Sequence, residues 1–253
     1  MQIKSKMIDI DGVPAYHAYP ESDEDNEKHP GLIVIHEIWG LVPHIKDVAE
    51  RFAKEGYSVI APDLFHDITF EGTVEQKLFD EMHDPKTKDE AQKKMRAILA
   101  PIQAPEFAGK TLAKLEECVK YLIEDSHVVS EDVGVLGFCF GGTYSFALAA
   151  LDPRIKAAVP FYGHPLKPEK VSELNCPILA FYGDQDKNLM DTLPEFKNRM
   201  QAHNKDFTAV VYPNTGHAFF NDTNARMYDK KSAVDAWNKT LKFLKKNLDN
   251  DRE

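Results

Sequence analysis

The chain has 253 residues, 43% of them hydrophobic, and a formal net charge of -10 at pH 7. This length allows a full buried core, and α/β proteins of this size are commonly one domain, so we expect a single domain over residues 1–253. The acidic balance and the lack of a basic cluster argue against nucleic acid or an anionic membrane as partners, because phosphate groups are bound by Lys and Arg gathered on one face.

The first residues, Met1–Met7, contain no long apolar stretch, and nowhere does the sequence hold the run of about 18 apolar residues that a membrane span needs. The cysteines Cys118, Cys139 and Cys176 are an odd number at wide spacing and form no CxxC pair. Such usage is typical of a reducing compartment. We therefore expect a soluble, cytoplasmic protein whose partners are small molecules.

Residues from Met7 to Tyr19 alternate weakly around Asp11-Gly12, which predicts an antiparallel hairpin at the edge of a sheet. After it, short apolar runs typical of buried strands alternate with segments whose apolar residues recur at helical spacing. The expected strands cover 32–35, 58–62, 133–136, 157–162, 178–182 and 207–212, and the expected helices cover 45–53, 107–123, 143–151, 193–202 and 237–248. This order predicts an α/β fold with a mostly parallel sheet and helices on both faces.

The segment at 63–105 is less regular and is long for a connection. Its three prolines and mixed charge predict a partly helical insertion. Two interpretations are open: a lid above the carboxyl ends of the strands, where such segments shape substrate pockets, or an ordinary irregular crossover.

Reactive side chains follow the ends of successive expected strands. Glu37, Cys139, Asp184, Asp186 and His217 each come shortly after an apolar run. In α/β sheets of this kind, function gathers beyond the carboxyl ends of the strands. The sequence therefore predicts one functional rim that carries these groups.

Cys139 lies in the stretch Gly137–Gly142, between an expected strand and an expected helix of small residues. This G-x-C-x-G pattern is the cysteine form of the G-x-S-x-G nucleophile turn. Such a turn lifts the side chain above the sheet and directs the first amides of the helix at it, which favours a thiolate and later an oxyanion. The alternative is a buried cysteine that acts only as a small hydrophobe.

The order Cys139, Asp186, His217 is the nucleophile, acid, base order of α/β hydrolases. His217 would hold the sulfur through one ring nitrogen while the acid fixes the tautomer through the other. Asp184 could replace Asp186, and either could instead cap the next helix. His217 could be an ordinary core or surface histidine, and Glu37 could simply join a buried polar network. The joint placement of the set favours catalysis. The backbone N–H groups of Ile38 and Phe140 are the expected oxyanion donors.

The segments His36–Gly40, Gly137–Gly142, Gly183–Asp186 and His217–Phe219 closely resemble the dienelactone hydrolase family, the carboxymethylenebutenolidases. The similarity runs from Ile33 to the last helix. It implies an α/β-hydrolase fold, no metal or organic cofactor, and a triad of Cys139, His217 and Asp186, the last chosen over Asp184 by its place in the motif. It also implies that Glu37 takes the proton of the Cys139 thiol when substrate displaces it from another partner.

The sequence departs from the family in its substrate contacts. Family members hold a substrate carboxylate with two arginines, but Asn221 stands four residues after His217, and Arg96 is the only arginine between Phe52 and Pro153. An amide cannot make the charge-assisted bidentate pair of an arginine. We therefore expect activity on other esters or lactones and little preference for a substrate carboxylate.

Trp39 and Tyr162 are candidate pocket residues together with Asn221, although Trp39 and Tyr162 could equally be core residues. The sequence thus predicts a cysteine-dependent hydrolase of carboxylic esters or lactones that works through an acyl thioester. A thioesterase or general carboxylesterase with the same residues is the alternative. A further alternative is a non-catalytic binding or redox-sensing protein that uses Cys139 as an oxidisable thiol.

Overall fold

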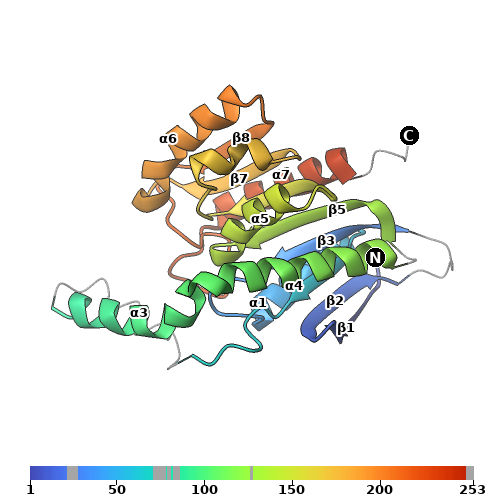
Figure 1. Ribbon diagram of the computed structural model, residues 1–253, viewed down its shortest axis with the longest axis horizontal. Coiled ribbons are helices and arrows are strands. Elements are labelled where there is room, and N and C mark those ends of the chain that lie inside the picture. Colours follow the sequence, from blue (N-terminus) through green and yellow to red (C-terminus); the bar gives the residue numbers. More distant parts are fainter. Residues whose placement is uncertain (22–27, 71–77, 79–80, 82–85, 126–127, 249–253) are drawn as a thin grey trace.

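A twisted sheet forms the centre of the computed structural model, which describes residues 1–21, 28–70, 78, 81, 86–125 and 128–248 (Figure 1). In the described part of the chain the strand order is β1-β2-β4-β3-β5-β6-β7-β8, and every neighbouring pair from β4 onward is parallel. The hairpin expected around Asp11-Gly12 is present and joins β4 in antiparallel fashion. The strands are β1 (Ile3–Ile10), β2 (Val13–Pro20), β3 (His29–Ile35), β4 (Ser58–Pro62), β5 (Val128–Phe138), β6 (Ile155–Phe161), β7 (Ile178–Gly183) and β8 (Phe207–Tyr212).

Helices cover both faces of this sheet, as its parallel strands require. The rings of Phe52 in α1 and Trp237 in α7 lie 4.4 Å apart between centroids, which places these two helices together on one face. Phe146 of α5 and Phe196 of α6 meet at 5.3 Å on the other, where α4 also packs against α5 (Figure 1). The helices are α1 (Pro43–Lys54), α3 (Lys88–Gln103), α4 (Pro105–Glu124), α5 (Phe140–Leu151), the short 3-10 helix η1 (Pro168–Glu173), α6 (Lys187–Ala202) and α7 (Lys230–Leu248).

The core lies between the sheet and these two helical layers. Every residue of β3 and β4 is buried, which explains why both read as continuous apolar runs in place of an alternating pattern. Gly56 adopts a φ of +99° and ends α1, so the chain can turn into β4 at once. The α/β architecture predicted from the sequence is confirmed.

Several boundaries differ from the expected ones. Helix α6 begins at Lys187, six residues before the expected start, and contains Pro194. Strand β5 extends from Val128 to Phe138 and so reaches the cysteine directly. Helix α5 starts at Phe140, the residue after it.

The expected insertion at 63–105 falls partly outside the described residues. Its described part contains α3, which is followed after Ala104 by α4 and extends outward from the body of the protein (Figure 1). Ala91, Met95 and Ile98 of α3 form a small apolar cluster with Leu78, separate from the main core. None of the described helices is both long and apolar enough to cross a membrane.

Candidate active site

The turn that carries Cys139 is forced by close backbone contacts. Cys139 has a φ of 55° and a ψ of -111°, a conformation that a residue with a side chain rarely adopts. A Cβ on Gly137 would lie 2.3 Å from the carbonyl oxygen of Gly141, and one on Gly141 would lie 2.2 Å from that of Ile35. Glycine at both positions therefore lets helix α5 lie close to β5, through Gly137, and to β3, through Gly141, which holds Cys139 in this turn.

Cys139 is the one cysteine that reaches a pocket. It is partly exposed and lines a cavity of about 130 Å³, whereas Cys118 and Cys176 are buried. Burial raises the pKa of the Cys118 thiol and that of the Cys176 thiol to about 12. Those two thiols stay protonated at neutral pH and are poor nucleophiles.

His217 comes from the loop after β8 and lies between Cys139 and Asp186. Its Nδ1 is 2.5 Å from Oδ2 of Asp186, and its ring also forms a hydrogen bond with Cys139. Asp186 precedes α6 but makes no capping hydrogen bond to that helix, so its carboxylate is directed to His217. The structure thus brings the three residues into one chain of contacts.

Asp184 plays a different part in the same region. One of its carboxylate oxygens accepts hydrogen bonds from the Gln185 side chain at 2.8 Å and from the Thr215 N–H at 3.4 Å. Thr215 lies two residues before His217. Asp184 therefore braces the loop that carries the histidine, while Asp186 contacts the ring itself.

The surroundings of His217 favour its charged form. Burial lowers the pKa of His217, but the hydrogen bonds to Asp186 and Cys139 and the negative charges of these groups raise it to about 10. An imidazolium at neutral pH beside a cysteine sulfur is the arrangement that stabilises a thiolate.

Glu37 is buried at the same site, with only 2% of its surface exposed. One carboxylate oxygen, Oε2, accepts a hydrogen bond from Asn221 Nδ2 at 2.8 Å, and Oε1 faces the Tyr162 hydroxyl at 3.4 Å. Burial raises the pKa of Glu37, while the contacts with Asn221, His217 and Tyr162 lower it. Burial has the larger effect, so the pKa of Glu37 lies above its ordinary value.

The Asn221 amide has a fixed orientation. Its Oδ1 accepts hydrogen bonds from the Thr223 N–H at 3.1 Å and from the Thr223 hydroxyl at 2.6 Å. The amide NH2 group must then point to Glu37, where it can only donate. Asn221 lines the pocket, and its polar groups form hydrogen bonds with Glu37 and Thr223.

His36 fixes the loop that carries Glu37, a role that sequence reasoning missed. The Leu64 N–H donates to His36 Nε2 at 3.1 Å, so the ring proton sits on Nδ1, which donates to the Glu37 carbonyl oxygen at 2.6 Å. Burial lowers the pKa of His36 to about 4 and keeps the ring neutral. The loop thus depends on a contact with a residue 28 positions away.

The two residues expected to donate to an oxyanion come from the loop after β3 and from the start of α5. Ile38 lines the catalytic pocket, and Phe140 is the first residue of α5, where backbone N–H groups have no partner within the helix. The Phe140 side chain packs into an aromatic group with Tyr144 and Phe65, at centroid distances of 4.5 and 5.1 Å. This packing anchors the start of α5 without involving its amide.

The pocket that Cys139 lines has walls that the sequence only partly indicated. Trp39 lines it, whereas Tyr162 does not: Tyr162 is fully buried, and its ring lies 5.0 Å from that of His217. Arg226 lines the pocket and was missed, because it lies nine residues after the histidine and not four. Its only local signal was position on the loop after β8. The pocket is lined by Glu37, Ile38, Trp39, Cys139, His217, Ala218, Asn221, Asn224, Arg226 and Met227.

The insertion at 63–105 contributes no residue to this pocket among those that the structure describes. Arg96, the arginine of that segment, is exposed on α3. The lid and the irregular crossover both stay open as interpretations of this segment.

Comparison with known proteins finds relatives that match almost the whole chain. The sequence model of the dienelactone hydrolase family matches residues 13–248. A protein of Saccharolobus solfataricus named "Putative carboxymethylenebutenolidase" is 32% identical, over 96% of this chain and 98% of that one. A Bradyrhizobium protein named "Probable 2-oxo-3-(5-oxofuran-2-ylidene)propanoate lactonase" is 32% identical, over 87% of this chain and 84% of that one.

Solved structures agree with these sequence matches. A crystal structure from Klebsiella pneumoniae described as "Putative Dienelactone Hydrolase" has a TM-score of 0.78 and 29% identity, and covers 96% of this chain and 99% of that one. A dienelactone hydrolase from Anabaena variabilis has a TM-score of 0.65 with 16% identity, over 98% of both chains, and supports the fold alone.

Proposed function

This chain belongs to the dienelactone hydrolase family, and from that membership and the site geometry we propose that it hydrolyses small carboxylic esters or lactones through an acyl thioester on Cys139. It is a hydrolase of the α/β-hydrolase fold. The observation that carries the cysteine mechanism is the chain of contacts from Cys139 through His217 to Asp186 at the wall of one pocket.

In the first half of the proposed reaction, the Cys139 thiolate attacks the carbonyl carbon of the substrate and the carbonyl oxygen takes the negative charge. The N–H groups of Ile38 and Phe140 stabilise this oxyanion, and each such donor is typically worth about 3 kcal/mol in the transition state. The C–O bond then breaks, and the His217 imidazolium gives its proton to the leaving oxygen.

In the second half, neutral His217 takes a proton from water as the water oxygen attacks the thioester carbon. The C–S bond breaks, the carboxylic acid leaves, and the thiolate and imidazolium are restored. Asp186 keeps the ring in one orientation throughout, because its carboxylate accepts the Nδ1 proton.

Glu37 supports this cycle by receiving the Cys139 proton when the resting enzyme holds a thiol. A thiol resists oxidation better than a thiolate, so such control protects the nucleophile. Burial raises the pKa of the Glu37 carboxyl, which favours a group that can take up a proton. Alkylation of Cys139 by iodoacetamide should be faster with a substrate analogue bound in a way that displaces Glu37, and the Glu37→Gln variant should lose this acceleration. Equal rates with and without the analogue in the parent would count against this role.

Arg226 revises the expected substrate preference. The two arginine positions of the family remain unmatched, but Arg226 supplies a cation at the pocket wall from another place on the loop. A charge-assisted hydrogen bond contributes roughly 1.5–3 kcal/mol. The Arg226→Gln variant should therefore lose about tenfold to a hundredfold in kcat/KM for esters with a free carboxylate and should keep its activity on neutral esters. Equal losses on both would exclude a role in selecting charge.

The cysteine mechanism is tested by pre-steady-state kinetics on p-nitrophenyl acetate, with the parent and the Cys139→Ala variant. The parent should release p-nitrophenol in a burst followed by slower turnover, because acylation precedes deacylation. The variant should show neither. A folded parent with no Cys139-dependent turnover on a panel of esters, lactones and thioesters would favour the redox-sensing alternative, and a preference for thioesters would favour the thioesterase.

A further inference from the structure

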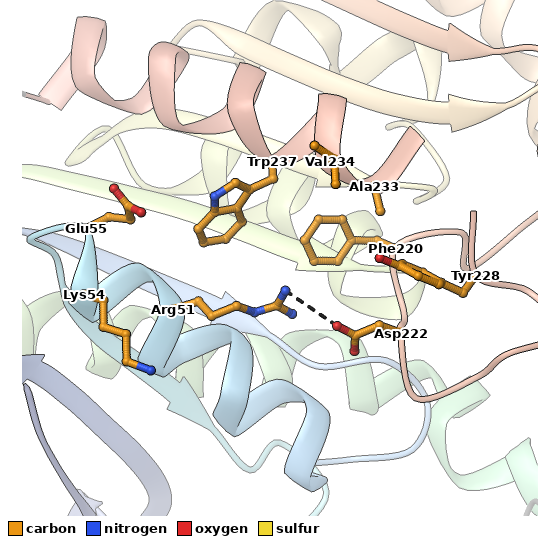
Figure 2. Close-up of a pocket in the computed structure, with 9 residues that line it drawn as sticks. All are labelled: Arg51, Lys54, Glu55, Phe220, Asp222, Tyr228, Ala233, Val234 and Trp237. Atoms are coloured by element: carbon orange, nitrogen blue, oxygen red, sulfur yellow. Dashed lines mark ion pairs between the residues drawn. The ribbon is translucent and has the colours of Figure 1, made fainter. Parts of the chain in front are cut away.

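A second cavity lies between α1 and the first half of α7, beside the loop that follows β8 (Figure 2). Its volume is about 290 Å³, near the lower end of the roughly 300–1,000 Å³ of ligand pockets. It shares no lining residue with the pocket that contains Cys139. Its lining combines three aromatic rings with charged groups: Arg51, Lys54, Glu55, Phe220, Asp222, Tyr228, Ala233, Val234 and Trp237.

Arg51 is the central charged group of this cavity. Its Cζ lies 5.6 Å from the ring centroid of Phe220 and also 5.6 Å from that of Trp237. Both distances are in the range of cation–π interactions, which hold the guanidinium beside the two rings. Figure 2 shows it below the rings, with Asp222 at one end of the cavity and Glu55 at the other.

The guanidinium is poorly satisfied. Its Nε and Nη2 are buried and have no hydrogen-bond partner among the described residues. The ion pair of Nη1 with Asp222 spans 3.7 Å, which is too long for a hydrogen bond, and the contact of Nε with Asp47 at 3.0 Å lacks hydrogen-bond geometry. About one third of the Arg51 side chain is exposed, and an oxygen ligand in the cavity would give these donors a partner once the guanidinium turns toward it.

We propose that this cavity binds a planar organic anion, namely a carboxylate attached to an aromatic or unsaturated ring. The ring would lie against Trp237 and Phe220, and the carboxylate would accept hydrogen bonds from Arg51, the strong geometry for a guanidinium. Lys54, one turn further along α1, adds a second positive charge to the same wall. Glu55 stands at the far end and so leaves this position open (Figure 2).

Binding here reaches the catalytic loop through two residues. Phe220 is three residues from His217, and its ring stacks on that of Phe138, next to Cys139, at 5.2 Å. Asp222 follows Asn221, whose side chain donates a hydrogen bond to Glu37. Asp222 Oδ1 also lies 3.4 Å from Nδ1 of the buried His44. A ligand that draws Arg51 away from Asp222 would weaken the ion pair that links this loop to α1.

The tryptophans allow a direct binding assay. The sequence has two, Trp39 in the catalytic pocket and Trp237 in this cavity, so in a Trp39→Phe background all tryptophan fluorescence comes from the proposed site. The protein is first alkylated at Cys139 with iodoacetamide, which blocks the catalytic pocket. Benzoate serves as the probe, and benzamide is its neutral counterpart of the same shape.

Benzoate should change the fluorescence of Trp237 saturably and should bind at least about tenfold more tightly than benzamide, because only the anion pairs with Arg51. In the Arg51→Met variant this advantage should disappear. The matched control is Arg199→Met, which removes an exposed arginine that also pairs with an acid one helical turn earlier, Glu195, but lines neither of the two pockets described above. That variant should bind benzoate like the parent.

Three results would overturn the proposal: no saturable response of the folded Trp39→Phe protein, benzamide or the cation benzamidine binding as tightly as benzoate, or equal affinities in the Arg51→Met and Arg199→Met variants. If the Arg51→Met variant fails to fold by circular dichroism, the comparison of benzoate, benzamide and benzamidine in the Trp39→Phe protein decides the question. The assay involves no catalysis, so its outcome is independent of the proposed reaction.

Discussion

Replacing Asp186 by asparagine would change one charge of the site and almost nothing of its shape. The Asp186 carboxylate lies 2.5 Å from Nδ1 of His217 and accepts the proton there, which leaves the other ring nitrogen to serve Cys139. An asparagine side chain can donate to Nδ1 instead. The ring proton would then sit on the nitrogen that faces the sulfur, and the neutral ring could no longer accept a proton from water.

The size of the effect follows from the two functions that this contact combines. In a comparable protease triad, an amide in place of the acid lowers kcat by about 10⁴ through the wrong tautomer. At 1.36 kcal/mol for each tenfold change, this corresponds to about 5 kcal/mol. Here Asp186 also helps to hold the pKa of His217 at about 10 against the effect of burial. We expect kcat on p-nitrophenyl acetate to fall by roughly 10³ to 10⁴ in the Asp186→Asn variant.

The control is Asp184→Asn, two residues away. Asp184 contacts Gln185 and Thr215 and not the histidine ring, so this variant should stay within about threefold of the parent. Steady-state kinetics of both variants, with circular dichroism to verify folding, complete the test. A loss of less than tenfold in Asp186→Asn, or equal losses in the two variants, would refute the assignment of Asp186 as the acid that orients His217.

Three further predictions concern other parts of the site. The pKa of His217 is raised from the ordinary 6.5 to about 10, so its imidazolium persists to high pH. The basic limb of the profile of kcat/KM against pH should therefore titrate near pH 10. A limb near pH 6.5 would contradict the ion pair. The Asn221→Leu variant removes a hydrogen bond that lowers the pKa of the buried Glu37, so Glu37 should stay protonated to higher pH. The acidic limb of the same profile should therefore move to higher pH. An unchanged limb would show that Asn221 does not control the pKa of Glu37. Gly141→Ala should lower the free energy of unfolding, measured in urea, by about 3 kcal/mol or more, because the new Cβ would lie 2.2 Å from a backbone oxygen. Gly109→Ala, at an open helix position, should raise the free energy of unfolding by about 0.5–1 kcal/mol. Similar values for both variants would refute the close-contact argument.

Local pattern was sufficient for the elements and for the order of the reactive residues. The strands at 58–62 and 207–212 were predicted with the observed bounds, because each is a short apolar run between turn residues. Helix α6 was predicted to begin at Leu193, whereas it begins at Lys187 and contains Pro194; its Phe196 packs against Phe146 of α5.

Contacts between distant residues were beyond such patterns. The hydrogen bond between Asn221 and Glu37 joins positions 184 residues apart, and only the folded chain shows that the amide faces the glutamate. The same holds for His36 and Leu64, and for Arg226, whose place at the pocket depends on the path of the loop after β8. Sequence reasoning found the residues that a motif fixes by spacing and missed those that the tertiary fold positions.

The most direct test of the account is to trap the covalent intermediate. Parent protein mixed with p-nitrophenyl acetate, quenched with acid within the burst and digested, should yield one acetylated peptide by mass spectrometry, the peptide that contains Cys139. The buried Cys118 and Cys176 should remain unmodified. Acetylation at another residue, or full turnover by the Cys139→Ala variant with no acetylated peptide, would contradict the cysteine mechanism.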